Sequence, residues 1–98
     1  MVSKKLLDNA EEAAEFLNLI SNEKRLAILA ILLSGEMTVG TMADKVDLSQ
    51  SALSQHLAKL RSLDLVETRR DRQMIYYSCN SEAVRKVLHT LDGIFGEA

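Results

Sequence analysis

Residues 48–61 hold the side chains best suited to bind another molecule. At about 100° per residue, three leucines of this stretch fall within one narrow arc, which predicts a helix with a single buried stripe. The opposite face carries short hydroxyl and amide side chains, whereas a solvated helix face is usually dense in Glu and Lys. Glutamine can pair with adenine, and serine can bond to bases or phosphates. The stripe is Leu53, Leu57 and Leu60, and the polar face is Ser51, Gln55, Ala58 and Ser62, flanked by Ser54 and Lys59.

The segment before this helix supplies a partner helix. Residues 39–46 have apolar side chains at helical spacing, and Thr38 can cap their first turn. A tight connection follows, in which Ser49 can cap the next helix. Two helices joined by a turn of about three or four residues, the second with a polar outer face, form a helix-turn-helix. Residues 48–61 alone would equally suit a Ser-rich helix with a solvated face, so this context favours DNA binding.

After residue 64 the apolar period changes from that of a helix to that of a strand. Residues 65–70 and 73–78 are rich in β-branched and aromatic side chains, which predicts a hairpin with Asp71-Arg72 at its junction. Guanidinium groups on a projecting ribbon suit phosphates or a minor groove, although arginines also serve only to keep an exposed edge soluble. A hairpin after a helix-turn-helix makes a winged helix, which favours DNA contact. The residues predicted at its tip are Arg69, Arg70, Arg72 and Gln73.

Three further helices are predicted, over residues 5–20, 23–33 and 81–95. The second is apolar nearly all round, which is typical of a central buried helix, and Gly35 is expected to end it in the left-handed conformation. Residues 36–39 allow a short extended piece. We therefore predict an α+β class that is mostly helical, with residues 1–98 forming a single winged helix-turn-helix domain.

The first and last helices carry more apolar surface than end helices need. Pairing of these two helices with those of a second copy would cover this surface, and a two-fold dimer would place two polar helices about one DNA turn apart. The alternative is that both helices only cover the core of their own chain. The predicted homodimer interface comprises Leu7, Ala10, Ala14, Leu17, Val84, Val87, Leu88, Leu91, Ile94 and Phe95.

The charge of the chain is unevenly distributed. The formal net charge is −2, made up of −3 over residues 1–48, +2 over residues 49–73 and −1 over residues 74–98. The positive segment is thus the one that holds the polar helix and the hairpin. Such a patch on an acidic scaffold can contact phosphates, with non-specific affinity that is modest and sensitive to salt.

Composition also bears on location. No apolar run approaches the ~18 residues of a membrane span, and the first residues lack the apolar run of a signal peptide. Cys79 is the single cysteine, so it cannot form an internal disulfide, which fits a reducing cytosol. We expect a cytoplasmic protein without a membrane partner.

No arrangement of residues predicts catalysis or a cofactor. His56 lies at the edge of the polar helix and is expected to pack and hydrogen-bond there, and Cys79 is expected to be a small buried side chain. His89 and Asp92 could supply two metal ligands, but zinc takes about three or four, and Glu82 and Glu97 are candidates by chemistry alone. We predict that the protein is not an enzyme and has no metal site.

The order of elements and the residues themselves resemble the ArsR/SmtB family of bacterial winged-helix repressors. Residues 22–29, 48–60 and 69–77 carry the resemblance, and the Ser-Gln-Ser-Ala-Leu-Ser-Gln-His-Leu run of residues 49–57 is its most specific part. Within the family, the chain is most similar to the branch that contains NolR and HlyU. The resemblance implies a homodimer, built on the first and last helices, that binds an imperfect inverted repeat in double-stranded promoter DNA and regulates transcription as a repressor.

Several residue roles are implied by this resemblance. Gln50, Ser51, Ser54 and Gln55 would enter the major groove, and Arg69, Arg70 and Arg72 would hold the flanking backbone. Thr38 would lie near a phosphate, and Lys59 and Gln73 complete the predicted DNA-binding set.

The chain departs from the sensing members of the family. Met37-Thr38-Val39-Gly40 stands where metal sensors have a Cys-x-Cys pair, and the lone Cys79 excludes a sensing disulfide within the chain. The inducer is therefore unknown. Two other readings remain: a metal- or ligand-responsive sensor with an unrecognised site, and a protein-interaction module that has lost DNA binding.

Overall fold

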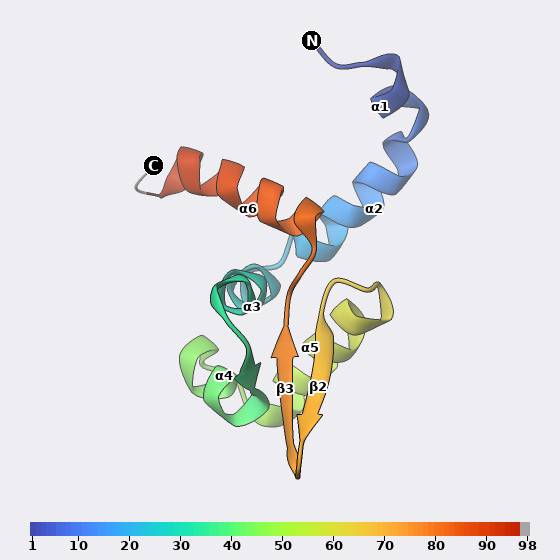
Figure 1. The fold of residues 1–98 in the computed structure, drawn as a ribbon. Helices are drawn as coiled ribbons and strands as arrows, with labels where there is room; N and C mark the ends of the chain where they lie inside the picture. Colours follow the sequence, from blue (N-terminus) through green and yellow to red (C-terminus); the bar gives the residue numbers. More distant parts are fainter. Residues whose placement is uncertain (97–98) are drawn as a thin grey trace.

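Six helices and three short strands make up the described part of the chain, residues 1–96, in this computed structural model (Figure 1). The helices are α1 (Lys4–Asp8), α2 (Ala10–Ile20), α3 (Glu23–Ser34), α4 (Val39–Val46), α5 (Gln50–Ser62) and α6 (Glu82–Phe95). The strands are β1 (Met37–Thr38), β2 (Glu67–Asp71) and β3 (Met74–Ser78), which form one antiparallel sheet in the order β1-β3-β2. The predicted winged helix-turn-helix of mostly helical α+β class is confirmed.

The first predicted helix is interrupted. Asn9 leaves helical geometry, with φ −104° and ψ 19°, and its side-chain amide donates to the carbonyl of Lys5 at 3.0 Å. Asparagine competes in this way with the helical hydrogen bonds of the backbone. The prediction of one continuous helix over residues 5–20 is therefore wrong at this residue. The short α1 contains no buried residue and lies at the far end of the molecule from the hairpin (Figure 1).

Helix α3 is the central helix of the core, as predicted. Asn22 caps its start by accepting the backbone N–H groups of Lys24 and Arg25. Its three buried side chains are at most 1 % exposed: Ile28, Leu29 and Leu32. Gly35 follows with φ 162° and ψ 163°, which is extended backbone, so the expected left-handed exit is wrong. The chain instead runs straight on into β1.

The helix-turn-helix is bounded by the caps that the sequence predicts. The Thr38 hydroxyl accepts the N–H of Thr41 at 3.4 Å, and the Ser49 hydroxyl accepts the N–H of Ala52 at 3.1 Å. Asp47 ends α4 in the left-handed conformation, with φ 55°. The predicted stripe of α5 is at most 1 % exposed: Leu53, Leu57 and Leu60.

The hairpin, residues 67–78, is called the wing here. It begins two residues later than predicted, because Leu65 and Val66 are buried in the core before the strand starts. Its turn consists of Arg72 and Gln73, one position beyond the predicted junction. The wing tip projects away from the terminal helices (Figure 1).

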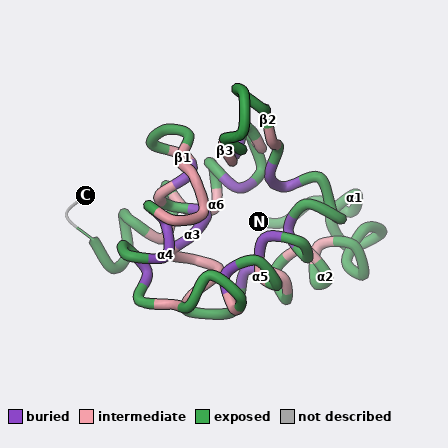
Figure 2. Tube along the Cα trace, turned by 90° about the horizontal axis from the view of Figure 1, so that it is seen from below, coloured by how far each residue is buried: buried purple, intermediate pink, exposed green. Residues whose placement is uncertain are grey.

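The core lies where α3, α4, α5 and the start of α6 meet. Figure 2 shows buried segments gathered on the central helices, with exposed residues along α1 and α2. Val84 fixes α6 to this core and is fully buried. Among residues 1–96, no helix is long and apolar enough to cross a membrane.

Candidate nucleic-acid interface

The outer face of α5 is open to solvent. It comprises the polar residues predicted from the sequence together with Gln50, and all of them are exposed. The side chains of Gln50, Ser51, Ser54 and Gln55 form no hydrogen bond with another described residue. Their donors and acceptors are therefore available to a partner. The residues of this face are Gln50, Ser51, Ser54, Gln55, Ala58 and Ser62.

Two cations at the start of α3 fix the orientation of the helix-turn-helix. The Nζ of Lys24 donates to the carbonyl of Val46, the last residue of α4, at 2.8 Å. Arg25 reaches α5, where its Nε donates to Nδ1 of His56 at 3.2 Å, and α2, where it donates to the carbonyl of Leu19 at 3.3 Å. Neither role was predicted from the sequence. Cations in the first turn of a helix oppose its dipole, and this is a signal that they have partners elsewhere.

His56 is the acceptor in its contact with Arg25. Burial lowers the pKa of His56 and the charge of Arg25 lowers it further, so the imidazole stays neutral at neutral pH. An accepting Nδ1 requires the proton on Nε2. The predicted structural role of His56 at the helix edge is confirmed.

Arg69 is engaged within its own chain. Its guanidinium forms a forked ion pair with Glu36, with contacts of 2.5 to 3.0 Å, and lies 4.6 Å from the ring centroid of Tyr76. The hydrogen bonds from Arg69 lower the pKa of Glu36, and those same bonds raise the pKa of Arg69. Arg69 also lies opposite Tyr76 in the middle of the wing. Its predicted position at the tip is therefore wrong.

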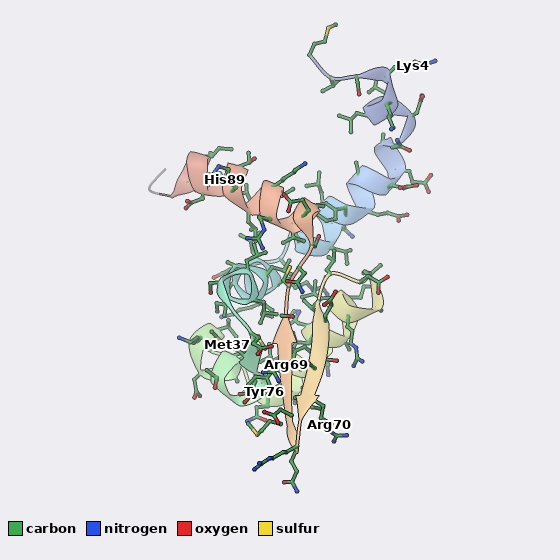
Figure 3. The ribbon with its side chains drawn as sticks, viewed as in Figure 1. Lys4, Met37, Arg69, Arg70, Tyr76 and His89 are labelled. Atoms are coloured by element: carbon green, nitrogen blue, oxygen red, sulfur yellow. The ribbon has the colours of Figure 1, made fainter. Side chains whose placement is uncertain are left out.

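Arg70 lies on the other face of the wing, because neighbouring residues of a strand point to opposite faces. Thr68 and Tyr77 share this face, and Tyr77 lines a groove with side chains of α5. Figure 3 shows Arg70 on the opposite side of the hairpin from Arg69. Arg70 forms no ion pair with a described carboxylate. It therefore presents an available cation on the side of the wing that faces α5.

The turn presents the remaining wing residues of the predicted set. Arg72 and Gln73 are exposed, and Arg72 forms no ion pair with a described carboxylate. Arg72 adopts the left-handed conformation, with φ 60°, which is unfavourable for a residue with a side chain. Asp47 and Asp64 adopt the same conformation.

Thr38 and Lys59 lie at the edges of the interface. Thr38 is half-buried, and its hydroxyl is used as the cap of α4 and in a 3.2 Å hydrogen bond with the hydroxyl of Thr41. Lys59 lies on the flank of α5 away from the wing, beside Glu15 and Leu19 of α2. The structure thus brings the outer face of α5, Arg70 and the wing tip together and sets Thr38 and Lys59 at the margins.

The terminal helices leave apolar side chains uncovered. Leu7, Leu17, Ile94 and Phe95 are 53–82 % exposed, and Ala10 and Ala14 are exposed as well. Between α3 and α6 lies an open groove of about 780 Å³. Of the predicted interface, Val84 is fully buried in the core of its own chain, and Val87 and Leu88 are half-buried against that core. Apolar side chains of this groove are Leu26, Ala30, Leu33, Leu88, Leu91 and Phe95.

The candidate metal and redox residues remain isolated. His89 and Asp92 lie at the edge of the α3–α6 groove, and within residues 1–96 no group of three or more possible ligands is placed to hold a metal ion. Glu82 lies 3.9 Å from Arg85, and Glu97 is outside the described residues. Cys79 is 2 % exposed, and burial raises the pKa of its thiol, which confirms its expected role as a small buried side chain.

Known proteins share both the sequence and the fold. Residues 22–68 match the family described as bacterial regulatory protein, arsR family. Nodulation protein NolR of Rhizobium meliloti is 58 % identical over 90 residues, covering 92 % of this chain and 74 % of NolR. Transcriptional activator HlyU of Vibrio cholerae is 41 % identical over 90 residues, covering 92 % of this chain and 83 % of HlyU. The crystal structure of the transcriptional repressor BigR from Xylella fastidiosa, 31 % identical, matches the full length of both chains with a TM-score of 0.91.

Proposed function

This chain belongs to the ArsR family of bacterial regulatory proteins and is a DNA-binding transcriptional regulator, and we propose that it works as a homodimer covering an imperfect inverted repeat in promoter DNA. The expected similarity to the branch of NolR and HlyU is confirmed. Members of this family are regulators and not enzymes, so the serines of α5 serve binding. The observation that carries the proposal is the outer face of α5, where the amides and hydroxyls of Gln50, Ser51, Ser54 and Gln55 are exposed and form no hydrogen bond with another described residue. Beside this face lies Arg70, which forms no ion pair with a described carboxylate.

The roles of the interface residues divide by chemistry. Gln50, Ser51, Ser54 and Gln55 read base edges in the major groove, where amides and hydroxyls discriminate between base pairs. The wing holds phosphates through Arg70, Arg72 and Gln73, and Thr38 and Lys59 make contacts at the margins. Phosphate contacts carry no sequence information, so affinity for all sequences falls with salt. Arg69 belongs to the ion pair with Glu36 in the free protein and enters this set only if that pair opens.

The partner copy covers the terminal helices. Leu17 on α2 and Phe95 on α6 are exposed, and a chain of 98 residues buries a limited core of its own. A two-fold dimer through these helices presents two copies of α5 to one face of the duplex, about one helical turn apart. The two-fold symmetry is the reason for expecting an inverted repeat, and the spacing sets the distance between its half-sites.

The dimer is tested by sedimentation. We expect the wild-type protein to sediment as a dimer and Leu17→Asp as a folded monomer. Met74→Asp is a matched control, since Met74 is an exposed apolar residue of the wing. A monomeric wild type, or a Leu17→Asp variant that stays dimeric, would contradict the proposed interface.

We place the regulator in the cytoplasm, where its DNA target lies, with no membrane partner. A dimer seated on a promoter blocks access of polymerase, so repression is the proposed outcome. Among the relatives, BigR is named a repressor and HlyU an activator. A promoter-fusion assay with and without the protein tests the direction, because activation raises reporter output where repression lowers it.

Two variants test whether α5 contacts bases and the wing contacts phosphates. Binding is titrated on a duplex selected by the wild-type protein and on a scrambled duplex of the same composition. We expect Gln55→Ala to lose affinity mainly for the selected duplex, by about 1–3 kcal/mol, and Arg70→Ala to weaken both duplexes alike. Equal losses on the two duplexes for both variants would show that the assigned roles are wrong.

A further inference from the structure

A groove of about 430 Å³ lies between α5 and β3. It runs along the side of α5 that faces the wing, and of its five lining residues only Ser54 was in the DNA-binding set predicted from the sequence. Arg61 contributes from the last turn of α5 and Tyr77 from the central strand of the sheet. The lining residues are Ser54, Ala58, Arg61, Ser62 and Tyr77.

The groove is lined for an anion. Arg61 is exposed and forms no ion pair with a described carboxylate, and no carboxylate lines the groove. The hydroxyls of Ser54 and Tyr77 have no hydrogen-bond partner among the described residues. Ser62 donates to the carbonyl of Lys59 at 2.7 Å, so its proton is already in use. The guanidinium of Arg61 and the hydroxyl of Tyr77 thus line one groove as available donors, which suits phosphate oxygens.

The position of the groove favours a phosphate of the DNA backbone as the anion. On one side lies the outer face of α5, and on the other lies the face of the wing that carries Arg70. A DNA strand that passes from the base-reading helix to the wing must cross this groove. The backbone of Tyr77 is held in place because its strand pairs with both neighbours, Thr68 on β2 and Met37 on β1.

We propose that this groove binds a phosphate of the DNA backbone, with Arg61 as its cation and the Tyr77 hydroxyl as a neutral donor. The inference rests on the proposed function and extends it, because it adds a contact between the base-reading helix and the wing. Since both donors come from rigid elements, the contact fixes how far the duplex enters between them.

Salt dependence separates the two donors. Affinity is measured from ~50 to ~200 mM salt for the wild type, Arg61→Gln and Tyr77→Phe, on a selected duplex and on a scrambled one. Affinity falls as salt rises, so the slope of log affinity against log salt is negative. Losing one phosphate contact per protomer makes this slope shallower by about 0.9, hence by about 1.8 for a dimer. For Arg61→Gln, the loss of affinity over this salt range then shrinks about tenfold relative to wild type. Tyr77→Phe weakens both duplexes without changing the slope, because no charge is removed.

Two variants serve as matched controls. Lys4→Gln removes one positive charge at the opposite end of the molecule from the wing (Figure 3). Tyr76→Phe removes a hydroxyl from the other face of the same strand. Both are expected to bind as the wild type does. Arg61→Lys keeps the charge and is expected to keep the slope, which separates loss of the contact from damage to α5.

The outcomes are distinguishable. An Arg61→Gln slope equal to that of Lys4→Gln, with wild-type binding intact, overturns the phosphate site and leaves the proposed function standing. If Tyr77→Phe binds DNA as well as Tyr76→Phe does, the Tyr77 hydroxyl does not contact the phosphate. A wild type that binds neither duplex at low salt overturns the proposed function, and this inference with it.

Discussion

The tip of the wing holds Arg72 in the left-handed conformation, with φ 60°. In this region the Cβ of an L-residue crowds the following carbonyl, which costs about 1–2 kcal/mol. Glycine avoids the clash, but its greater freedom in the unfolded chain offsets about 0.5–1 kcal/mol of the gain. We therefore expect Arg72→Gly to stabilise the fold by about 0.5–1 kcal/mol. For a domain of this size, this corresponds to a rise in Tm of about 2–8 °C.

The same substitution should weaken DNA binding. Arg72 forms no ion pair with a described carboxylate, and its charge is proposed to hold a phosphate. Its loss from both protomers makes the negative slope of log affinity against log salt shallower by about 1.8. The loss of affinity is equal on selected and scrambled duplexes. Stability and affinity thus change in opposite directions.

Calorimetry at fixed protomer concentration and a salt titration of binding measure the two effects. Arg72→Ala is the matched control, because it removes the charge but keeps the Cβ. It should lose the same affinity as Arg72→Gly without its gain in Tm. Equal Tm values for the two variants would refute the strain, and unchanged binding by both would refute the phosphate contact at the tip.

Three further predictions follow from other contacts. The pKa of His56 is lowered in the fold, so its contribution to stability is complete above its unfolded pKa of about 6.5 and is lost as pH falls. The Tm measured as a function of pH should fall below this pH in the wild type, and it should fall less in His56→Gln. Gly40→Ala should stabilise α4 against denaturant by up to about 1 kcal/mol, because the new Cβ would meet only Nε2 of Gln50, at 3.8 Å. Glu36→Gln should release Arg69 and give tighter DNA binding with a steeper salt dependence in the same titration.

Each of these has an outcome that contradicts it. A His56→Gln variant with the acid sensitivity of the wild type would mean that other groups cause the decline, and His89→Gln is the control because His89 is exposed on α6. A less stable Gly40→Ala would point to a close neighbour that the structure lacks. Weaker DNA binding by Glu36→Gln would mean that the ion pair positions the wing.

Features that depend on neighbouring residues could be predicted from the sequence. Thr38 and Ser49 each cap a helix through a hydroxyl that accepts an N–H three residues later. Because a cap acts over one turn, residue type and spacing suffice to find it. The leucine stripe of α5 follows for the same reason, since helical periodicity fixes which side is buried.

Contacts between distant parts of the chain could not be predicted in this way. Arg69 meets Glu36 across 33 positions, and Arg25 meets His56 across 31. Nothing local distinguishes Arg69 from Arg70, and only the strand register assigns them to opposite faces. Val84 shows the same limit, because an apolar residue on an end helix can face its own core or a partner.

The central claim, sequence-specific binding of duplex DNA by a dimer, is tested most directly by selecting bound sequences from a random duplex library. Salt of ~150 mM suppresses non-specific phosphate binding during the selection. We predict enrichment of an inverted repeat whose half-sites lie about one helical turn apart, matching two copies of α5. A folded dimer that enriches no sequence above background would contradict the claim and favour a protein-interaction role.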